Sequence, residues 1–139
     1  MKKLITVIMF TLVFSALYAT NRSRQEKTSE ELVLNNGTKW KVDQATDNNV
    51  ARLQQIAEKV NGHKLVDYHQ AGTTLQAGIN QMIKECHMKG PDHLALHKWL
   101  EPLMKQVNQL KQATTPASAK IHFSEVKKRL TLFNQYFKV

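Results

Sequence analysis

The sequence predicts an all-α protein, an antiparallel four-helix bundle preceded by a short extended arm. Two observations predict this fold. Four segments after residue 42 carry apolar residues at spacings of three and four, which is the repeat of one helix face. Short stretches that contain Gly or Pro separate these segments, and short connections favour antiparallel neighbours in a bundle.

The first 19 residues have the three parts of a cleavable secretory signal peptide. Lys2 and Lys3 carry positive charge, an apolar run covers residues 4–17, and Ala19 is a small residue at the expected cleavage point. The run is shorter than the roughly 20 residues that a membrane-spanning helix needs, which argues against a retained anchor. We therefore expect a periplasmic or secreted protein with no membrane span after cleavage.

The rest of the chain is expected to form one domain. Residues 20–31 are polar and lack periodicity, so we expect a flexible leader there. A single helical-bundle domain is expected over 32–139, with its extended arm at 32–42. Asn36-Gly37 between strand-prone residues predicts a hairpin turn within that arm.

Each predicted helix is bounded by residue types that stop a helix. The expected ranges are 43–60, 65–86, 92–113 and 117–137. Gly62 ends the first helix, Pro91 interrupts the chain before the third, and Asp92 is its expected N-cap. Gly72 and Gly78 are expected to weaken the second helix, because glycine is a poor helix former.

The chain is basic, with a formal net charge of +9 that would fall to +7 once Lys2 and Lys3 leave with the signal peptide. A basic surface can meet nucleic acid, anionic lipid or an acidic partner. Export and the lack of an aromatic-basic motif argue against nucleic acid, so we expect no nucleic-acid partner. A solvated basic face is the simplest interpretation.

The sequence contains one cysteine, Cys86, which cannot form an internal disulfide. In an oxidising compartment such a thiol is buried, paired with a second chain, bound to a metal or left reactive. A Cys86-linked homodimer is therefore one of the expected possibilities.

Metal-capable side chains gather around the turn between the second and third helices. His93 and His97 are four residues apart, so they lie on one helix face, and that face continues as the apolar stripe of the third helix. Cys86 ends the apolar stripe of the preceding helix. A tight turn is expected to bring Cys86 and Met88 back beside the two histidines, at one end of the bundle.

Thiolate, thioether and imidazole together suit copper(I), and cysteine with histidine also suits zinc. We therefore predict a copper or zinc site formed by Cys86, Met88, His93 and His97. Haem held by His and Met is a weaker alternative, and the chain has no Cys-x-x-Cys-His motif for covalent attachment. The alternative without a ligand is that the histidines bond to turn carbonyls and Asp92 while the Met and Cys fill the core.

The other histidines that a bundle would place near its opposite end are His63, His69 and His122. They offer a second, weaker metal-site hypothesis, because no thiol or acidic pattern accompanies them.

Several runs resemble a family of small exported helical proteins of Bacteroidetes-type bacteria. These runs are Leu34-Asn35-Asn36-Gly37-Thr38-Lys39-Trp40-Lys41-Val42, Cys86-x-Met88-Lys89-Gly90 with His93, Leu96-His97-Lys98-Trp99-Leu100, and Phe133-x-x-Tyr136-Phe137. The likeness covers most of the chain after the signal peptide. It implies export and a helical fold, but no reaction, because the family has no established activity. The fold is also similar to periplasmic four-helix cytochromes, whose Met on the first helix and His on the last have no evident match here.

The leading hypothesis is a non-enzymatic periplasmic metal-binding protein for sequestration, delivery or sensing. The alternative is a structural or interaction module of the cell envelope, in which basic faces, Trp40 and Trp99 contact a partner protein and Cys86 is core or an intermolecular disulfide. An enzyme is a third and weaker class, because no Walker, Rossmann or nucleophile-elbow motif and no prominent acid pair is found.

Overall fold

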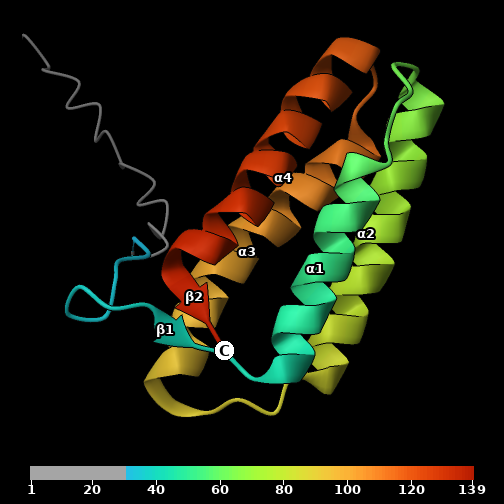
Figure 1. The fold of residues 1–139 in the computed structure, drawn as a ribbon. Coiled ribbons are helices and arrows are strands. Elements are labelled where there is room, and N and C mark those ends of the chain that lie inside the picture. Colours follow the sequence, from blue (N-terminus) through green and yellow to red (C-terminus); the bar gives the residue numbers. More distant parts are fainter. Residues whose placement is uncertain (1–30) are drawn as a thin grey trace, which may run out of the picture.

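The computed structural model describes residues 31–139, which form four helices between two short strands (Figure 1). The elements are β1 Trp40–Lys41, α1 Gln44–Glu58, α2 Leu65–Glu85, α3 Gly90–Gln112, α4 Pro116–Tyr136 and β2 Phe137–Lys138. The four predicted helices are confirmed, and each observed end lies within two residues of the predicted one. The expected signal peptide, 1–19, and all but the last residue of the leader, 20–31, lie outside the described residues.

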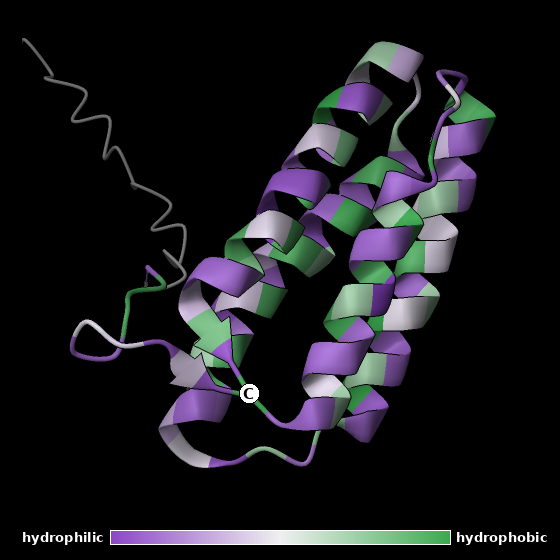
Figure 2. Ribbon diagram, in the orientation of Figure 1, coloured by the Kyte–Doolittle hydropathy of each residue, from purple (hydrophilic) through white to green (hydrophobic). Residues whose placement is uncertain are grey.

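The helices pack along one another and enclose an apolar core. Each helix contacts the next one in the chain, and α1 also contacts α4. Apolar and polar residues alternate along every helix (Figure 2), and the apolar ones supply the fully buried centre. The largest of these buried side chains are Trp99, Phe133, Leu53, Leu75, Ile79, Met82, Leu103, Leu110 and Leu130. Among the helices that the structure describes, none is both long enough and apolar enough to cross a membrane.

Asp43 begins α1 as its N-cap and connects that helix to the loop after α2. One carboxylate oxygen accepts a hydrogen bond from the Thr46 backbone N–H at 2.7 Å, which satisfies a free donor of the first turn. The other accepts from the His87 backbone N–H at 3.3 Å. Burial raises the pKa of Asp43, but these hydrogen bonds and the nearby His87 lower it more, so the pKa lies below its ordinary value.

The prediction that Asp92 is the N-cap of α3 is wrong. The helix begins two residues earlier, at Gly90, which adopts a φ of +71° that favours glycine, and Pro91 occupies the first turn. Asp92 therefore lies inside the helix, and its carboxylate accepts a hydrogen bond from the Lys41 backbone N–H at 3.0 Å. This contact attaches β1 to the start of α3.

The segment before α1 contains the predicted turn and pairs with the end of the chain. Asn36 and Gly37 both have positive φ, and Asn35 and Thr38 exchange two backbone hydrogen bonds of 2.9 Å across them. Beyond the turn, β1 pairs in parallel with β2, and the Val42 N–H donates to the Lys138 carbonyl at 2.8 Å. The carboxyl terminus consequently lies beside β1 (Figure 1).

Trp99, which the interaction hypothesis places at a partner surface, is instead fully buried, with 0% of its surface exposed. Its indole N–H donates to the Arg129 carbonyl at 2.8 Å, and its ring meets that of Phe133 edge-on at a centroid distance of 5.0 Å. A core position of this kind leaves Trp99 unable to contact a second protein.

Candidate functional site

Three of the four predicted metal ligands lie together where α2 ends and α3 begins. Cys86 is the C-cap of α2, and its Sγ lies 3.7 Å from Nδ1 of His93. The Nε2 atoms of His93 and His97 are 3.0 Å apart, and the two rings meet edge-to-face. His97 extends the row further, because its Nδ1 lies 4.0 Å from a carboxylate oxygen of Glu101. The result is a continuous row of thiol, imidazole, imidazole and carboxylate.

This row borders a cavity of about 320 Å³ between α2 and α3. The remaining lining is mostly apolar, and it includes two thioethers, from Met82 and Met104. Met82 is buried, whereas Cys86 is half-buried and the His97 side chain is 48% exposed. The cavity therefore has the buried Met82 thioether on its inner side and the partly exposed His97 imidazole at its rim.

Met88, the fourth predicted ligand, lies elsewhere. Its Sδ accepts a hydrogen bond from the buried Thr46 hydroxyl at 3.7 Å, and the side chain packs against the core beside the start of α1. It is not among the residues that line the cavity. The turn therefore does not bring Met88 beside the two histidines as predicted.

Met104, rather than Met88, lines the cavity beside the histidines, although it was not among the predicted ligands. It lies seven residues after His97, about two helical turns further along the same face of α3. The spacing of His93, His97 and Met104 would have identified it, because all three share one stripe. Glu101, four residues after His97, follows from the same spacing.

His93 presents different ring nitrogens to its two neighbours, Nδ1 to Cys86 and Nε2 to His97. For this reason the three side chains do not converge on a single point, and residues 31–139 contain no group of three or more His, Cys, Asp or Glu side chains placed to hold one metal ion. Each pair by itself has a suitable separation, since two ligands that each lie roughly 2.0–2.3 Å from one ion are about 3–4 Å apart.

Without a metal, a hydrogen bond between the two rings connects His93 and His97. One Nε2 must donate its hydrogen to the lone pair of the other across the 3.0 Å gap. An ion bound by both Nε2 atoms would require each neutral ring to carry its proton on Nδ1, and protonation of either ring to the imidazolium would compete with the ion, so binding would weaken in acid.

The end of α2 that carries Cys86 is fixed against α1. The buried Asn49 donates a hydrogen bond to the Glu85 carboxylate at 2.6 Å, and Gln81 donates to its other oxygen. These two hydrogen bonds hold the pKa of Glu85 below its ordinary value, and the bond from Asn49 has the larger effect. The neighbouring Cys86 is therefore presented from a well-anchored helix end.

The second group of histidines does not form a common site among the described residues. His69 bonds through Nε2 to the Ala113 carbonyl at 2.8 Å, and His122 bonds through Nδ1 to the Gln106 side chain at 3.0 Å. His63 is exposed on the loop before α2. Two of these imidazoles thus make separate contacts near helix ends.

Comparison of the chain with family models, with curated proteins and with solved structures finds no match. The resemblance to exported Bacteroidetes-type helical proteins consequently stays a prediction.

Proposed function

We propose that this chain is an exported, non-enzymatic metal-binding protein built as an antiparallel four-helix bundle, with copper(I) as the favoured ion and zinc as the second choice. The observation that carries the proposal is the contact of Cys86 with His93, and of His93 with His97, at the rim of one cavity. The packing of each helix on the next and of α1 on α4 supports the bundle.

Copper(I) is favoured because the ligands available here are soft. The cavity offers one thiol, two imidazoles and the thioethers of Met82 and Met104, and thiolate and thioether ligands select copper(I). For all three side chains to bind one ion, either the Cys86 side chain would have to move toward the Nε2 side of His93, or the His93 ring would have to rotate. We therefore propose Cys86, His93 and His97 as ligands. Met104 lies eleven residues after His93, roughly 16 Å further along α3, so it lines the cavity but cannot bind the same ion as His93.

Haem is disfavoured by the same geometry. His93 and His97 lie one turn apart on one helix with their Nε2 atoms 3.0 Å apart, so they cannot approach opposite faces of one haem. A single small ion is the occupant that suits this spacing.

The half-exposed His97 supports a role in sequestration or delivery rather than permanent storage. An ion with one ligand at the surface can exchange with another protein without unfolding of the bundle. The alternative, an interaction module of the cell envelope, loses Trp99 as a contact residue because that side chain is core.

Titration of the reduced protein with copper(I) and with zinc(II), each against a competing chelator, tests the proposal. We expect Cys86→Ser and the double variant His93→Ala, His97→Ala each to weaken copper(I) binding by 10-fold or more, because each removes a direct ligand. Met104→Leu should change the binding of either ion far less than these variants do, since residue 104 lies roughly 16 Å along α3 from His93.

Two matched variants serve as controls. Met88→Leu removes a thioether that contacts Thr46, and His87→Gln removes an exposed imidazole directly beside Cys86. Both should bind copper(I) as tightly as the parent chain. The proposal fails if the parent protein binds neither ion more tightly than the doubly substituted Cys86→Ser, His97→Ala protein. A dominant Cys86-linked dimer on a non-reducing gel, together with absent copper(I) binding, would instead favour the interaction module.

A further inference from the structure

A second cavity, of about 480 Å³, lies near the opposite end of the helices from Cys86, between α4 and the loop that joins α1 to α2. The α4 residues that border it fall on one face at helical spacing: Lys120, Phe123, Ser124, Lys127, Lys128 and Thr131. Val60, Gly62, His63 and Tyr68 complete the lining from α2 and the loop before it. Its volume falls within the range typical of small-molecule sites.

The charge of this lining has a single sign. Lys120, Lys127 and Lys128 border the cavity, and no Asp or Glu does. Glu125 lies 4.0 Å from Lys128 and partly offsets it. Lys120 and Lys127 form no ion pair with another residue of the segment 31–139. A cleft lined by one sign of charge concentrates its field on an anion.

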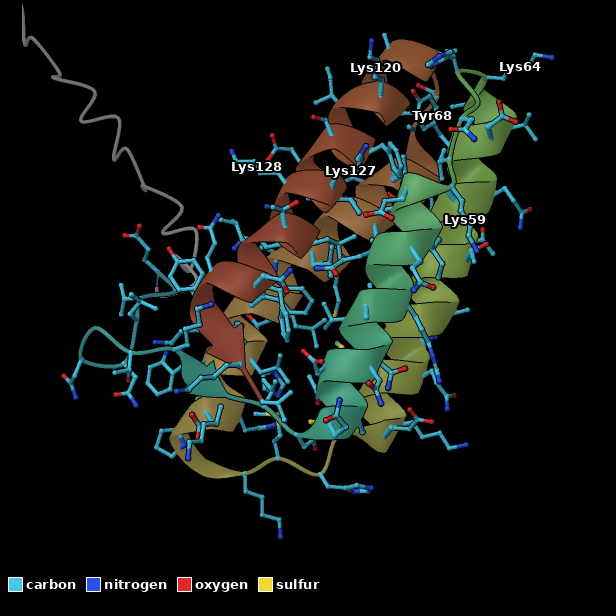
Figure 3. The ribbon with its side chains drawn as sticks, viewed as in Figure 1. Lys59, Lys64, Tyr68, Lys120, Lys127 and Lys128 are labelled. Carbon is cyan, nitrogen blue, oxygen red and sulfur yellow. The ribbon has the colours of Figure 1, made fainter. Side chains whose placement is uncertain are left out.

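Further lysines increase the positive potential at this end of the molecule. Figure 3 shows Lys59 and Lys64 near the ends of α1 and α2, Lys120 at the neighbouring end of α4, and Lys127 between α4 and α1. The nearby acid Asp67 is engaged by the Lys64 backbone N–H at 3.1 Å. The lysines therefore outnumber the carboxylates around the opening.

The cavity also offers apolar and hydroxyl surface. The ring of Tyr68, which is 4% exposed, packs against Phe123 at a centroid distance of 5.6 Å, and Val60 lies beside them. The Tyr68 hydroxyl has no hydrogen-bond partner within the described part of the chain. A ligand with both an anionic group and an apolar ring would use all of these surfaces, whereas an inorganic ion would use only the lysines.

We propose that this cavity binds an organic phosphate monoester, with the phosphate held by Lys120 and Lys127 and the organic part resting on Tyr68, Phe123 and Val60. Lysine ammonium groups bind phosphate as point charges, and the dianion matches two cations better than a carboxylate does. The site is separate from the proposed metal centre and does not depend on it.

Calorimetric titration of the chain from residue 20 to residue 139 with phenyl phosphate tests this proposal. We expect phenyl phosphate to bind at least about 10-fold more tightly than inorganic phosphate, and more tightly than benzoate. The double variant Lys120→Ala, Lys127→Ala should weaken phenyl phosphate binding about 10-fold or more, because two charge-assisted contacts are lost. Lys84→Ala together with Lys89→Ala removes two exposed lysines at the far end of α2 and should leave binding unchanged.

Phosphatidylcholine vesicles that contain phosphatidic acid identify the source of the phosphate. If the protein sediments with these vesicles and phenyl phosphate inhibits this, the natural ligand is a lipid phosphate. If the protein binds phenyl phosphate but does not sediment with the vesicles, the natural ligand is a soluble phosphate monoester. Both outcomes support the site. The proposal is overturned if phenyl phosphate does not bind, or if both double variants weaken its binding equally, since general charge attraction would then explain the effect.

Discussion

Asp43 makes one hydrogen bond within its own helix start and one to a loop that is distant in the sequence. Its carboxylate accepts hydrogen bonds from the Thr46 N–H, three residues away, and from the His87 N–H, 44 residues away. The first contact begins α1, and the second holds the loop that follows Cys86. A change at Asp43 should therefore affect stability and also the position of the candidate metal ligands.

Asp43→Ala should lower the free energy of unfolding by about 1 kcal/mol, because an N-cap is lost. Asp43→Asn keeps a capping oxygen and removes only the charge. The pKa of Asp43 is below its ordinary value of 3.8 in the folded state, so its charge stabilises the fold above that pH, and this contribution disappears as the pH falls through the lower folded-state value.

Urea unfolding of the parent chain and both variants, at neutral pH and at steps toward pH 3, measures this contribution. The difference between the parent and Asp43→Asn should shrink in acid. A difference that stays constant over this pH range would show that the Asp43 charge does not stabilise the fold.

Helix α2 illustrates what determines the packing of an element. From the sequence, both of its glycines, Gly72 and Gly78, are expected to weaken the helix. In the structure, the two glycines have different surroundings. A Cβ at position 78 would lie 2.7 Å from Cδ2 of Leu53, which is fully buried on α1, whereas one at position 72 would lie 2.7 Å from Cγ of the partly exposed Lys111 and 3.5 Å from the buried Leu110.

Gly78→Ala should destabilise the protein by about 1–2 kcal/mol, because overpacking against Leu53 outweighs the gain of roughly 1 kcal/mol in helix propensity. Gly72→Ala is the matched control. It should leave stability unchanged or raise it by up to about 1 kcal/mol, since Lys111 can move aside. Thermal and urea unfolding of both variants checks the order, and equal stabilisation by the two would contradict a close approach of α1 and α2 at Gly78.

In the molecule as a whole, the segment before α1 pairs with the segment after α4. The parallel pair β1 and β2 joins residues nearly 100 positions apart, and Phe137 anchors it. Phe137 is 3% exposed, stacks on Phe133 at a centroid distance of 4.9 Å and faces Trp99 at 6.5 Å. This aromatic cluster connects the carboxyl terminus, α3 and α4.

Phe137→Ala should cost about 3–5 kcal/mol of stability, as expected for truncation of a buried aromatic residue. It should also accelerate hydrogen exchange at the Val42 amide, which donates to the Lys138 carbonyl. Val139→Ala, at an exposed position two residues further on, should change neither quantity. Unaltered exchange at Val42 in Phe137→Ala would show that the strand pair does not depend on the aromatic cluster.

In the candidate metal site, contacts within one helix or across its adjoining turn were easier to predict than contacts with a distant helix. The i, i+4 spacing of His93 and His97 predicts that the two side chains lie on one helix face, and their Nε2 atoms are 3.0 Å apart there, because both belong to one helix. The approach of Cys86 across the turn was also expected, from the apolar stripe that it ends. Met88 was not placed correctly, because the side on which a loop residue packs depends on α1, an element that is distant in sequence.

The four helices, and their ends to within two residues, follow from the sequence alone, because a helix depends on contacts between residues three and four apart and on the Gly and Pro residues that interrupt them. Four features required the packed structure: Asp92 accepts the Lys41 N–H, Trp99 is core, Met104 rather than Met88 lines the cavity, and lysines of α4 line one cavity with Tyr68 of α2. These outcomes depend on the rotation and register of helices relative to one another, which packing between sequence-distant side chains sets.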